Sequence, residues 1–216
     1  MQSIIPLQDT VLVSGDVIAR DITYEEFLRR FDGQHVEWIN GVVIQMPTVG
    51  PPHNRLTRFS MRLLEDYLVL SNTDGEIFHD PMVMKTAPNL PGRAPDVFVV
   101  LAHQKHLIQA TEFAGAADLV IEIVSPGSQR ADRVDKLREY EKGGVGEYWV
   151  IDHTRRDALF YQLNAQGVFD LTAPDENGVY HSRILPKLSI SVAVFWQEFP
   201  PQGPEVTHMV EAMLKD

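Results

Sequence analysis

Two carboxylates stand inside strand-like apolar runs of this sequence, and a lysine follows them on a polar helical segment. Asp96 lies in the run Ala-Pro-Asp-Val-Phe-Val-Val at 94–100, and Glu122 lies in Asp-Leu-Val-Ile-Glu-Ile-Val at 118–124. Burying a carboxylate among β-branched residues is unfavourable unless a cation or hydrogen bonds hold it. Together with Lys136 and with Glu37 in an earlier hairpin, the pattern predicts a metal-dependent site that cleaves phosphodiester bonds.

Each of these residues also has a purely structural interpretation. Glu122 could pair with an arginine or cap a neighbouring helix, and Asp96 follows a proline, where aspartate commonly begins a turn. Glu37 would face solvent from one strand of its hairpin. Lys136 would be a solvated lysine that pairs with Asp132, four residues earlier. No residue is informative alone, so the prediction depends on their meeting in one place.

The apolar periodicity places the candidates on specific elements. Alternation puts Val120, Glu122 and Val124 on one face of a strand whose two faces both look buried, as in a central strand. The eight residue steps from 128 to 136 span about 12 Å of helix, enough to return Lys136 along the sheet toward Glu122.

The remaining elements follow from periodicity, capping and turn residues. We expect helices at 24–30, 54–70, 128–142 and 205–214, and a hairpin at 36–46 that turns at Asn40-Gly41. We expect strands at 11–13, 75–86 (bent at Pro81), 95–101, 118–124, 147–152, 159–163, 167–172 and 179–185. This order predicts one α/β domain over residues 1–216, with 1–20 loosely attached. Its core would be a mixed central β-sheet flanked by helices, with an N-terminal hairpin and a C-terminal β-meander.

Composition narrows the class of protein. The chain has 216 residues, of which 44% are hydrophobic and 23% charged, as in an ordinary globular protein. The absence of cysteine excludes disulfides and thiolate metal sites. We expect no signal peptide and no membrane helix, and therefore a cytoplasmic protein. The net charge of −11 argues against tight non-specific binding of nucleic acid, although acidic metal ligands would themselves add negative charge.

Several segments occur together in an order that is typical of one protein family. They are the hairpin at 36–46, Pro-His-Asn at 52–54, Pro-Asp-Val at 95–97, the strand segment at 118–126, the helical segment at 132–140 and the segment at 144–150 that leads into the next strand. This set covers most of the chain and resembles the PD-(D/E)XK superfamily, above all its Uma-type family of restriction-endonuclease-like proteins. In the superfamily the lysine usually lies two residues after the second acid, where this chain has Val124. Lys136 would supply the ammonium group instead.

The resemblance implies a restriction-endonuclease-like core and an endonuclease that hydrolyses DNA with a divalent cation, Mg²⁺ or Mn²⁺. Asp96 and Glu122 would bind the cation, and Glu37 would add an acidic group. His53 would line the same pocket, although its position at a helix start explains it equally well. Lys136 would orient the attacking water and neutralise charge on the phosphate. Superfamily members often act as homodimers, for which residues 195–196 and the C-terminal helix could supply an apolar patch.

Two other classes of function are open from the sequence. A catalytically inactive protein, which keeps the fold for binding or structure, is favoured by the acidic charge and the displaced lysine. A hydrolase with paired carboxylates and no metal would leave Lys136 without a role. Other motifs are weaker: Ser125 has no assignable histidine, and His103 and His106 lie in a predicted loop without nearby acidic residues. The glycines at 143–146 do not form a phosphate loop, and the three tryptophans are better explained as core or interface residues.

Overall fold

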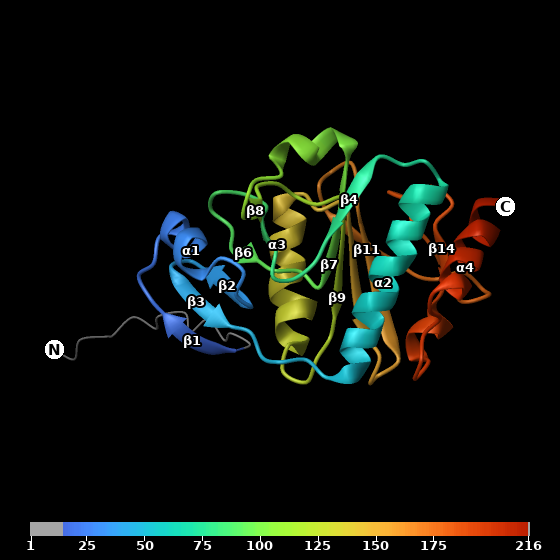
Figure 1. Cartoon of the computed structure of the whole chain (residues 1–216), viewed down its shortest axis with the longest axis horizontal. Helices are drawn as coiled ribbons and strands as arrows, with labels where there is room; N and C mark the ends of the chain where they lie inside the picture. Colours follow the sequence, from blue (N-terminus) through green and yellow to red (C-terminus); the bar gives the residue numbers. More distant parts are fainter. Residues whose placement is uncertain (1–14, 216) are drawn as a thin grey trace.

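The computed structural model describes residues 15–215, which form two six-stranded sheets, a small two-stranded sheet and surrounding helices (Figure 1). The strand predicted at 11–13 lies outside these residues. Within the segment 15–20, residues 16–19 form an edge strand, β1, which pairs with β3 of the N-terminal hairpin. In the described part of the chain, no helix combines the length and apolar composition that crossing a membrane requires.

The first sheet contains the predicted hairpin and has the strand order β1-β3-β2-β6-β5-β8. Asn40 and Gly41 both have positive φ, as a two-residue hairpin turn requires. Helix α1 (Tyr24–Phe31) packs beside this sheet and begins at Thr23, whose side chain accepts a hydrogen bond from the Glu26 backbone N–H. The strands are β1 (Asp16–Ala19), β2 (Val36–Ile39), β3 (Val42–Gln45), β5 (Val83–Lys85), β6 (Gly92–Arg93) and β8 (Glu112–Phe113).

The second sheet is the central one and has the order β12-β11-β10-β9-β7-β4. Its strands are β4 (Gly75–Phe78), β7 (Val97–Leu101), β9 (Leu119–Ile123), β10 (Glu147–Asp152), β11 (Asp157–Leu163) and β12 (Phe169–Thr172). Strands β9 and β10 are parallel and are connected by α3 (Lys136–Gly143), while the other pairs are antiparallel. The mixed sheet, its single crossover and the meander β10–β12 confirm the predicted fold class.

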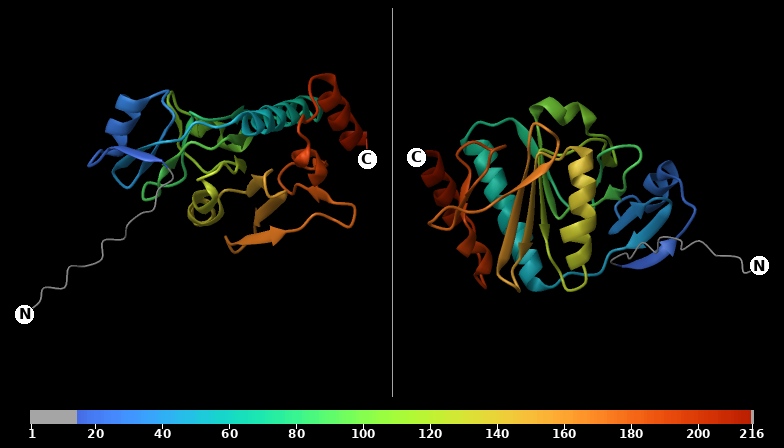
Figure 2. Two further views of the ribbon diagram at one scale, coloured as in Figure 1. Left: turned by 90° about the horizontal axis from the view of Figure 1, so that it is seen from below. Right: turned by 180° about the vertical axis from the view of Figure 1, so that it is seen from behind.

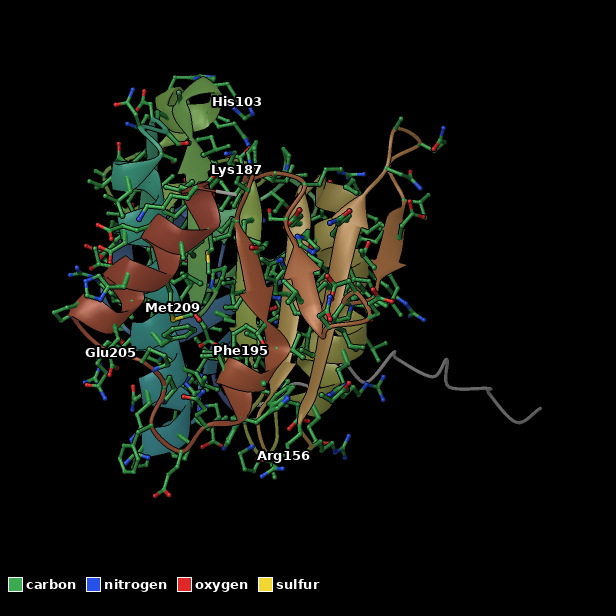
Figure 3. All side chains as sticks on the ribbon, turned by 90° about the vertical axis from the view of Figure 1, so that its right-hand side faces the viewer. His103, Arg156, Lys187, Phe195, Glu205 and Met209 are labelled. Atoms are coloured by element: carbon green, nitrogen blue, oxygen red, sulfur yellow. The ribbon has the colours of Figure 1, made fainter. Side chains whose placement is uncertain are left out.

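Helices cover both faces of the central sheet (Figure 2). Helices α2 (Pro51–Leu70) and α4 (Pro204–Lys215) lie on the face that carries Leu119, Ile121 and Ile123. Helix α3 lies on the opposite face, where its Tyr140 packs in one cluster with Val120 and others. Figure 3 shows α4 beside α2. Since Glu122 alternates with Ile121 and Ile123, the sheet directs Glu122 toward α3.

Several predicted bounds differ from those of the structure. The predicted strand 75–86 is two strands in different sheets, because the chain leaves β4 and passes Pro81 before β5. The helix predicted at 128–142 is present over 129–143, although residues 131–135 form a π-helical turn, η2 (Ala131–Asp135), before α3. Helix α2 starts at Pro51, since proline suits a first helical turn. The last predicted strand, 179–185, ends at His181.

The remaining elements complete the C-terminal part and the connections. Strand β13 (Val179–His181) pairs with β14 (Ser189–Ser191), which the sequence pattern missed. Two short 3₁₀ segments, η1 (Ala102–Leu107) and η3 (Val192–Trp196), follow β7 and β14.

Candidate functional site

The sheet register brings Asp96 next to Glu122. Asp96 immediately precedes β7, and β7 pairs with β9 so that Val97 faces Ile121. The Asp96 carboxylate extends past this pair, and its Oδ2 accepts a hydrogen bond of 2.7 Å from the Ile123 backbone N–H. The residue that follows Glu122 therefore anchors Asp96 directly.

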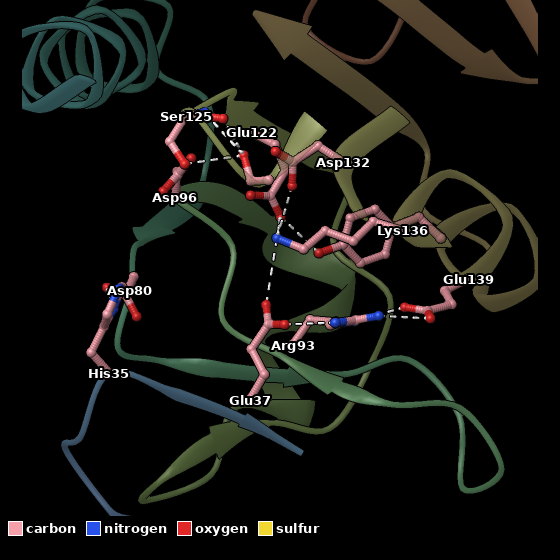
Figure 4. A network of polar contacts seen from close by, with 12 residues as sticks. His35, Glu37, Asp80, Arg93, Asp96, Glu122, Ser125, Asp132, Lys136 and Glu139 are labelled. Carbon is pink, nitrogen blue, oxygen red and sulfur yellow. Dashed lines mark hydrogen bonds and ion pairs between the residues drawn. The ribbon is translucent and has the colours of Figure 1, made fainter. Parts of the chain in front are cut away.

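Lys136 reaches this place from the start of α3 (Figure 4). Its Nζ lies 2.8 Å from Glu122 Oε1, 3.4 Å from Glu37 Oε1 and 3.3 Å from Asp132 Oδ1. The side chain of Lys136 is only 4% exposed, so the ammonium group faces carboxylates and not solvent. The interpretation of Lys136 as a solvated surface lysine is therefore wrong, although its pairing with Asp132 is real.

Glu37 enters the site from the first sheet and is held there by an arginine. Its side chain is 2% exposed, which excludes the interpretation as a solvent-facing strand residue. Arg93 Nη1 donates to Glu37 Oε2 over 2.6 Å, and the other guanidinium nitrogens donate to both oxygens of Glu139. This fork-to-carboxylate geometry fixes the guanidinium, which in turn fixes Glu37 so that Oε1 faces Lys136.

His53 lies in the first turn of α2 and contacts the other acid. Its Nε2 is 3.1 Å from Asp96 Oδ2, and its Nδ1 is 3.3 Å from Thr57 Oγ1. His53 is buried, so it is not a surface histidine. The contact orients Asp96 from the side of the helix.

One small cavity of about 40 Å³, which we call the acidic pocket, lies among these side chains. Glu37 contacts Lys136 of this pocket but is not one of its lining residues. Its walls include Asp96, Glu122, Asp132, Lys136 and His53. Hydrogen bonds and ion pairs use Oδ2 of Asp96 and Oε1 of Glu122. Within residues 15–215, each of these two acids thus retains one oxygen atom, Oδ1 or Oε2, without a protein hydrogen bond.

The electrostatics of the pocket leave Lys136 charged. Burial would lower the pKa of the Lys136 ammonium, but Glu122, Glu37 and Asp132 hold that pKa well above its ordinary value. Burial raises the pKa of Glu122 well above its ordinary value, and the nearby charges of Asp96 and Asp132 raise it further. Carboxylates outnumber cationic side chains here, so a bound cation would relieve the repulsion between them.

Three residues of the network were not among the sequence-based candidates. Asp132 was only an alternative partner for Lys136, yet it is buried in the pocket wall. Tyr140 donates a hydrogen bond of 3.0 Å to Glu122 Oε1, and its position on the inner stripe of α3 was the available signal. Arg93 lies in a two-residue strand and had no local signal, because its partner Glu37 is 56 residues away.

Other candidates lie outside this arrangement. His103 is exposed and lies 3.5 Å from Asp118 Oδ1, so the expectation that it has no acidic neighbour was wrong. Phe195, labelled in Figure 3, is buried and packs against Phe59 of α2, so it does not supply the exposed apolar patch proposed for a dimer. Ser125 lines the acidic pocket, and its backbone N–H donates to Ser128 Oγ.

The donor set of the pocket fits a hard divalent cation that also binds water and substrate. Residues 15–215 contain no group of three or more His, Asp or Glu side chains placed to surround a metal ion. Mg²⁺, however, is usually bound through one or two carboxylates and keeps several waters or takes phosphate oxygens. The free oxygens of Asp96 and Glu122 match that requirement, whereas a cation enclosed entirely by protein would not fit.

The mixed sheet with helices on both faces is the restriction-endonuclease-like fold that the resemblance implies, and it brings Asp96, Glu122 and Lys136 together. Residues 24–193 match the Uma2 family, which is described as "Putative restriction endonuclease". This match covers most of the chain, so the chain belongs to the Uma2 family.

One solved structure is similar over most of its length. It comes from Anabaena variabilis ATCC 29413 and is described as "a putative nuclease belonging to DUF820". The TM-score is 0.65 at 20% sequence identity, over 81% of this chain and 97% of that chain. At this identity the likeness establishes the fold alone. No curated protein matches the chain.

Proposed function

We propose that this protein is a metal-dependent endonuclease that hydrolyses phosphodiester bonds in DNA at the acidic pocket. One observation carries the proposal: a buried lysine from a helix contacts one of two neighbouring acids, and both acids line the same cavity. Family membership and the nuclease description of the structural relative support the same class of reaction. Acids alone would suit many hydrolases, but a fixed cation beside them suits an anionic substrate.

The two acids would share the metal. Asp96 and Glu122 would bind Mg²⁺ or Mn²⁺ through Oδ1 and Oε2, which accept no hydrogen bond from any other residue in 15–215. When bound, the cation would lower the pKa of a coordinated water and stabilise charge on the scissile phosphate. His53 and the Ile123 backbone N–H hold Asp96 in the required orientation.

Lys136 would act as a fixed positive charge and not as a general base. Its raised pKa keeps the amine protonated at neutral pH, so it cannot accept a proton from water. The ammonium would orient the attacking water and offset the negative charge that develops on the phosphate. Glu37, itself fixed by Arg93, sets the position of this ammonium group.

A nicking assay on supercoiled plasmid DNA tests this function. We expect conversion to the open circle with Mg²⁺ or Mn²⁺, and none with EDTA. Asp96→Asn and Lys136→Gln should each reduce the rate at least about 100-fold, the scale observed when a single transition-state donor is lost. Lys142→Gln, at an exposed position of the same helix, is the matched control and should nick at the wild-type rate.

Protein stability has to be measured beside activity, because removing a buried cation among carboxylates destabilises a fold by about 3 kcal/mol or more. Circular dichroism at the assay temperature identifies variants that remain folded. A folded Lys136→Gln protein that nicks as fast as the wild type would remove the role assigned to Lys136. Metal binding without nicking in the wild type would favour the alternative of an inactive, binding protein.

A further inference from the structure

A large groove beside α2 adjoins the acidic pocket. It has a volume of about 840 Å³, far more than the pocket itself. Four residues line both spaces, so the groove and the pocket are neighbours: His35, Val49, His53 and Asp96. The opposite wall is the C-terminal segment at 200–203.

Three arginines follow one flank of α2 along this groove. Arg55, Arg58 and Arg62 recur at spacings of three and four, which keeps them on one side of the helix. Their contacts point away from His53, toward the C-terminal segment. Arg58 Nη2 lies 3.3 Å from Gln202 Oε1, and Arg62 Nη2 lies 3.2 Å from Thr207 Oγ1.

Arg55 is held in place without losing its charge. Its guanidinium lies 4.5 Å from the centre of the Phe199 ring and donates to the Glu198 backbone carbonyl. Ring stacking and neutral oxygens restrict an arginine while leaving its positive charge uncompensated. In the described part of the chain, neither Arg55 nor Arg58 has a carboxylate within ion-pair distance, whereas Arg62 pairs with Asp66.

The acidic groups that face the groove mostly have partners of their own. Asp80 contacts His35, and Asp96 contacts His53, all at the end next to the acidic pocket. Of the acids that line the groove, Glu65 is exposed and lies near the arginines, and Glu198 and Glu205 are exposed on the C-terminal side outside the lining. The groove therefore has a positive flank along α2 and an acid–imidazole end at the pocket, although the whole chain is strongly acidic.

We infer that this groove binds the phosphodiester backbone of a DNA strand, with Arg55 and Arg58 contacting phosphates and the strand continuing past His53 to Asp96. The inference rests on the proposed nuclease function and assigns its substrate track. Arg55 and Arg58 are about 4.5 Å apart along the helix axis, close to the axial rise of about 3.4 Å between successive nucleotides of one strand of a duplex. Guanidinium groups are suited to phosphate because their donors match its oxygens.

The salt dependence of DNA binding tests the track independently of cleavage. Fluorescence anisotropy with a labelled duplex oligonucleotide, in EDTA so that no cleavage occurs, gives the dissociation constant at several salt concentrations. The logarithm of the binding constant falls linearly with the logarithm of the salt concentration, and each lost phosphate contact lowers the magnitude of this slope by about 0.9. We expect Arg55→Gln/Arg58→Gln to lower it by about 1.8 and to weaken binding at low salt.

Two further variants separate charge from folding. Arg58→Lys keeps the charge and should retain most of the wild-type slope, whereas Arg58→Gln should lose about one contact. Arg29→Gln, at an exposed position of α1 at the far end of the molecule, is the matched control and should bind like the wild type (Figure 1). An unchanged slope in the double variant, or no DNA binding by the wild type, would overturn the track.

The nicking assay distinguishes this failure from failure of the proposed function. If the double variant binds DNA as the wild type does while Asp96→Asn still abolishes nicking, the track is wrong and the nuclease site stands. If the double variant loses the salt slope while Asp96→Asn nicks normally, the groove binds DNA and the chemistry lies elsewhere.

Discussion

Lys136 is buried in the structure, although its place on a polar helix is typical of a solvent-exposed lysine. A lysine on a polar helix is usually solvated, yet here three carboxylates surround a buried ammonium. The pairing of Lys136 with Asp132 could be predicted from their i,i+4 spacing in the sequence. The contact of Lys136 with Glu37 could not be predicted in this way, because it depends on how the first sheet packs against the central sheet.

Glu37 should make the free energy of unfolding depend on pH in the acidic range. Burial alone would raise the pKa of the Glu37 carboxyl, but Lys136 and Arg93 hold it below its ordinary value of 4.5. Its contribution to stability is therefore complete above about pH 4.5 and is lost as the pH falls through the lower pKa of the folded state. The free energy of unfolding of the wild type should decrease as the pH falls from 6 to 3, which we call the acid limb. We expect this decrease to be smaller in Glu37→Gln, as measured by urea denaturation.

An exposed acid provides the comparison for this measurement. Glu25→Gln on α1 should leave the acid limb parallel to that of the wild type. Equal slopes for Glu37→Gln and the wild type below pH 4.5 would show that Lys136 and Arg93 do not stabilise the charged carboxylate.

At the scale of elements, α3 must bring Lys136 close to β9 and then end sharply. The π-helical turn before α3 brings Asp132 and Lys136 to the same pocket. At the other end, Gly143 and Gly144 stand together where α3 ends, but they have different roles. Gly144 has a φ of +88°, whereas a side chain on Gly143 would lie 2.5 Å from Thr86 Cβ.

The two glycines should therefore differ in their sensitivity to alanine. Gly144→Ala meets no atom within 4 Å, so only the left-handed backbone opposes it, at a cost of about 1 kcal/mol. Gly143→Ala clashes with Thr86 beside β5 and should cost about 2–3 kcal/mol. Urea denaturation measures both. A Gly143→Ala protein at least as stable as Gly144→Ala would contradict the close approach of α3 to residue 86.

At the scale of the whole molecule, sequence periodicity predicted the long elements and missed the short connections between sheets. The runs at 95–101 and 118–124 were recognisable because both faces are apolar, and they carry Asp96 and Glu122. Strands β6 and β8 have two residues each, too few for any periodic signal. Residues 75–86 were predicted as one bent strand, because the alternation of apolar residues does not reveal where the chain passes from one sheet to the other. The role of Arg93 could not be predicted from the sequence, because its contact with Glu37 depends on the fold.

The two sheets meet beside the acidic pocket, where Glu37 of the first sheet contacts Lys136, which lines the pocket. Such a site places carboxylates and a cation from distant parts of the chain around one cavity. The net charge of −11 is compatible with this function if DNA affinity comes from the local arginines of α2 and from a bound cation, and not from the general surface.

The most direct test is to locate the cation. A crystal soaked in Mn²⁺ and measured for anomalous scattering should show one peak in the acidic pocket, within coordination distance of a carboxylate oxygen of both Asp96 and Glu122. Crystals of Asp96→Asn under the same conditions should lose that peak. A pocket without anomalous density at saturating Mn²⁺, or a peak that contacts neither acid, would contradict the assignment of a metal-dependent site.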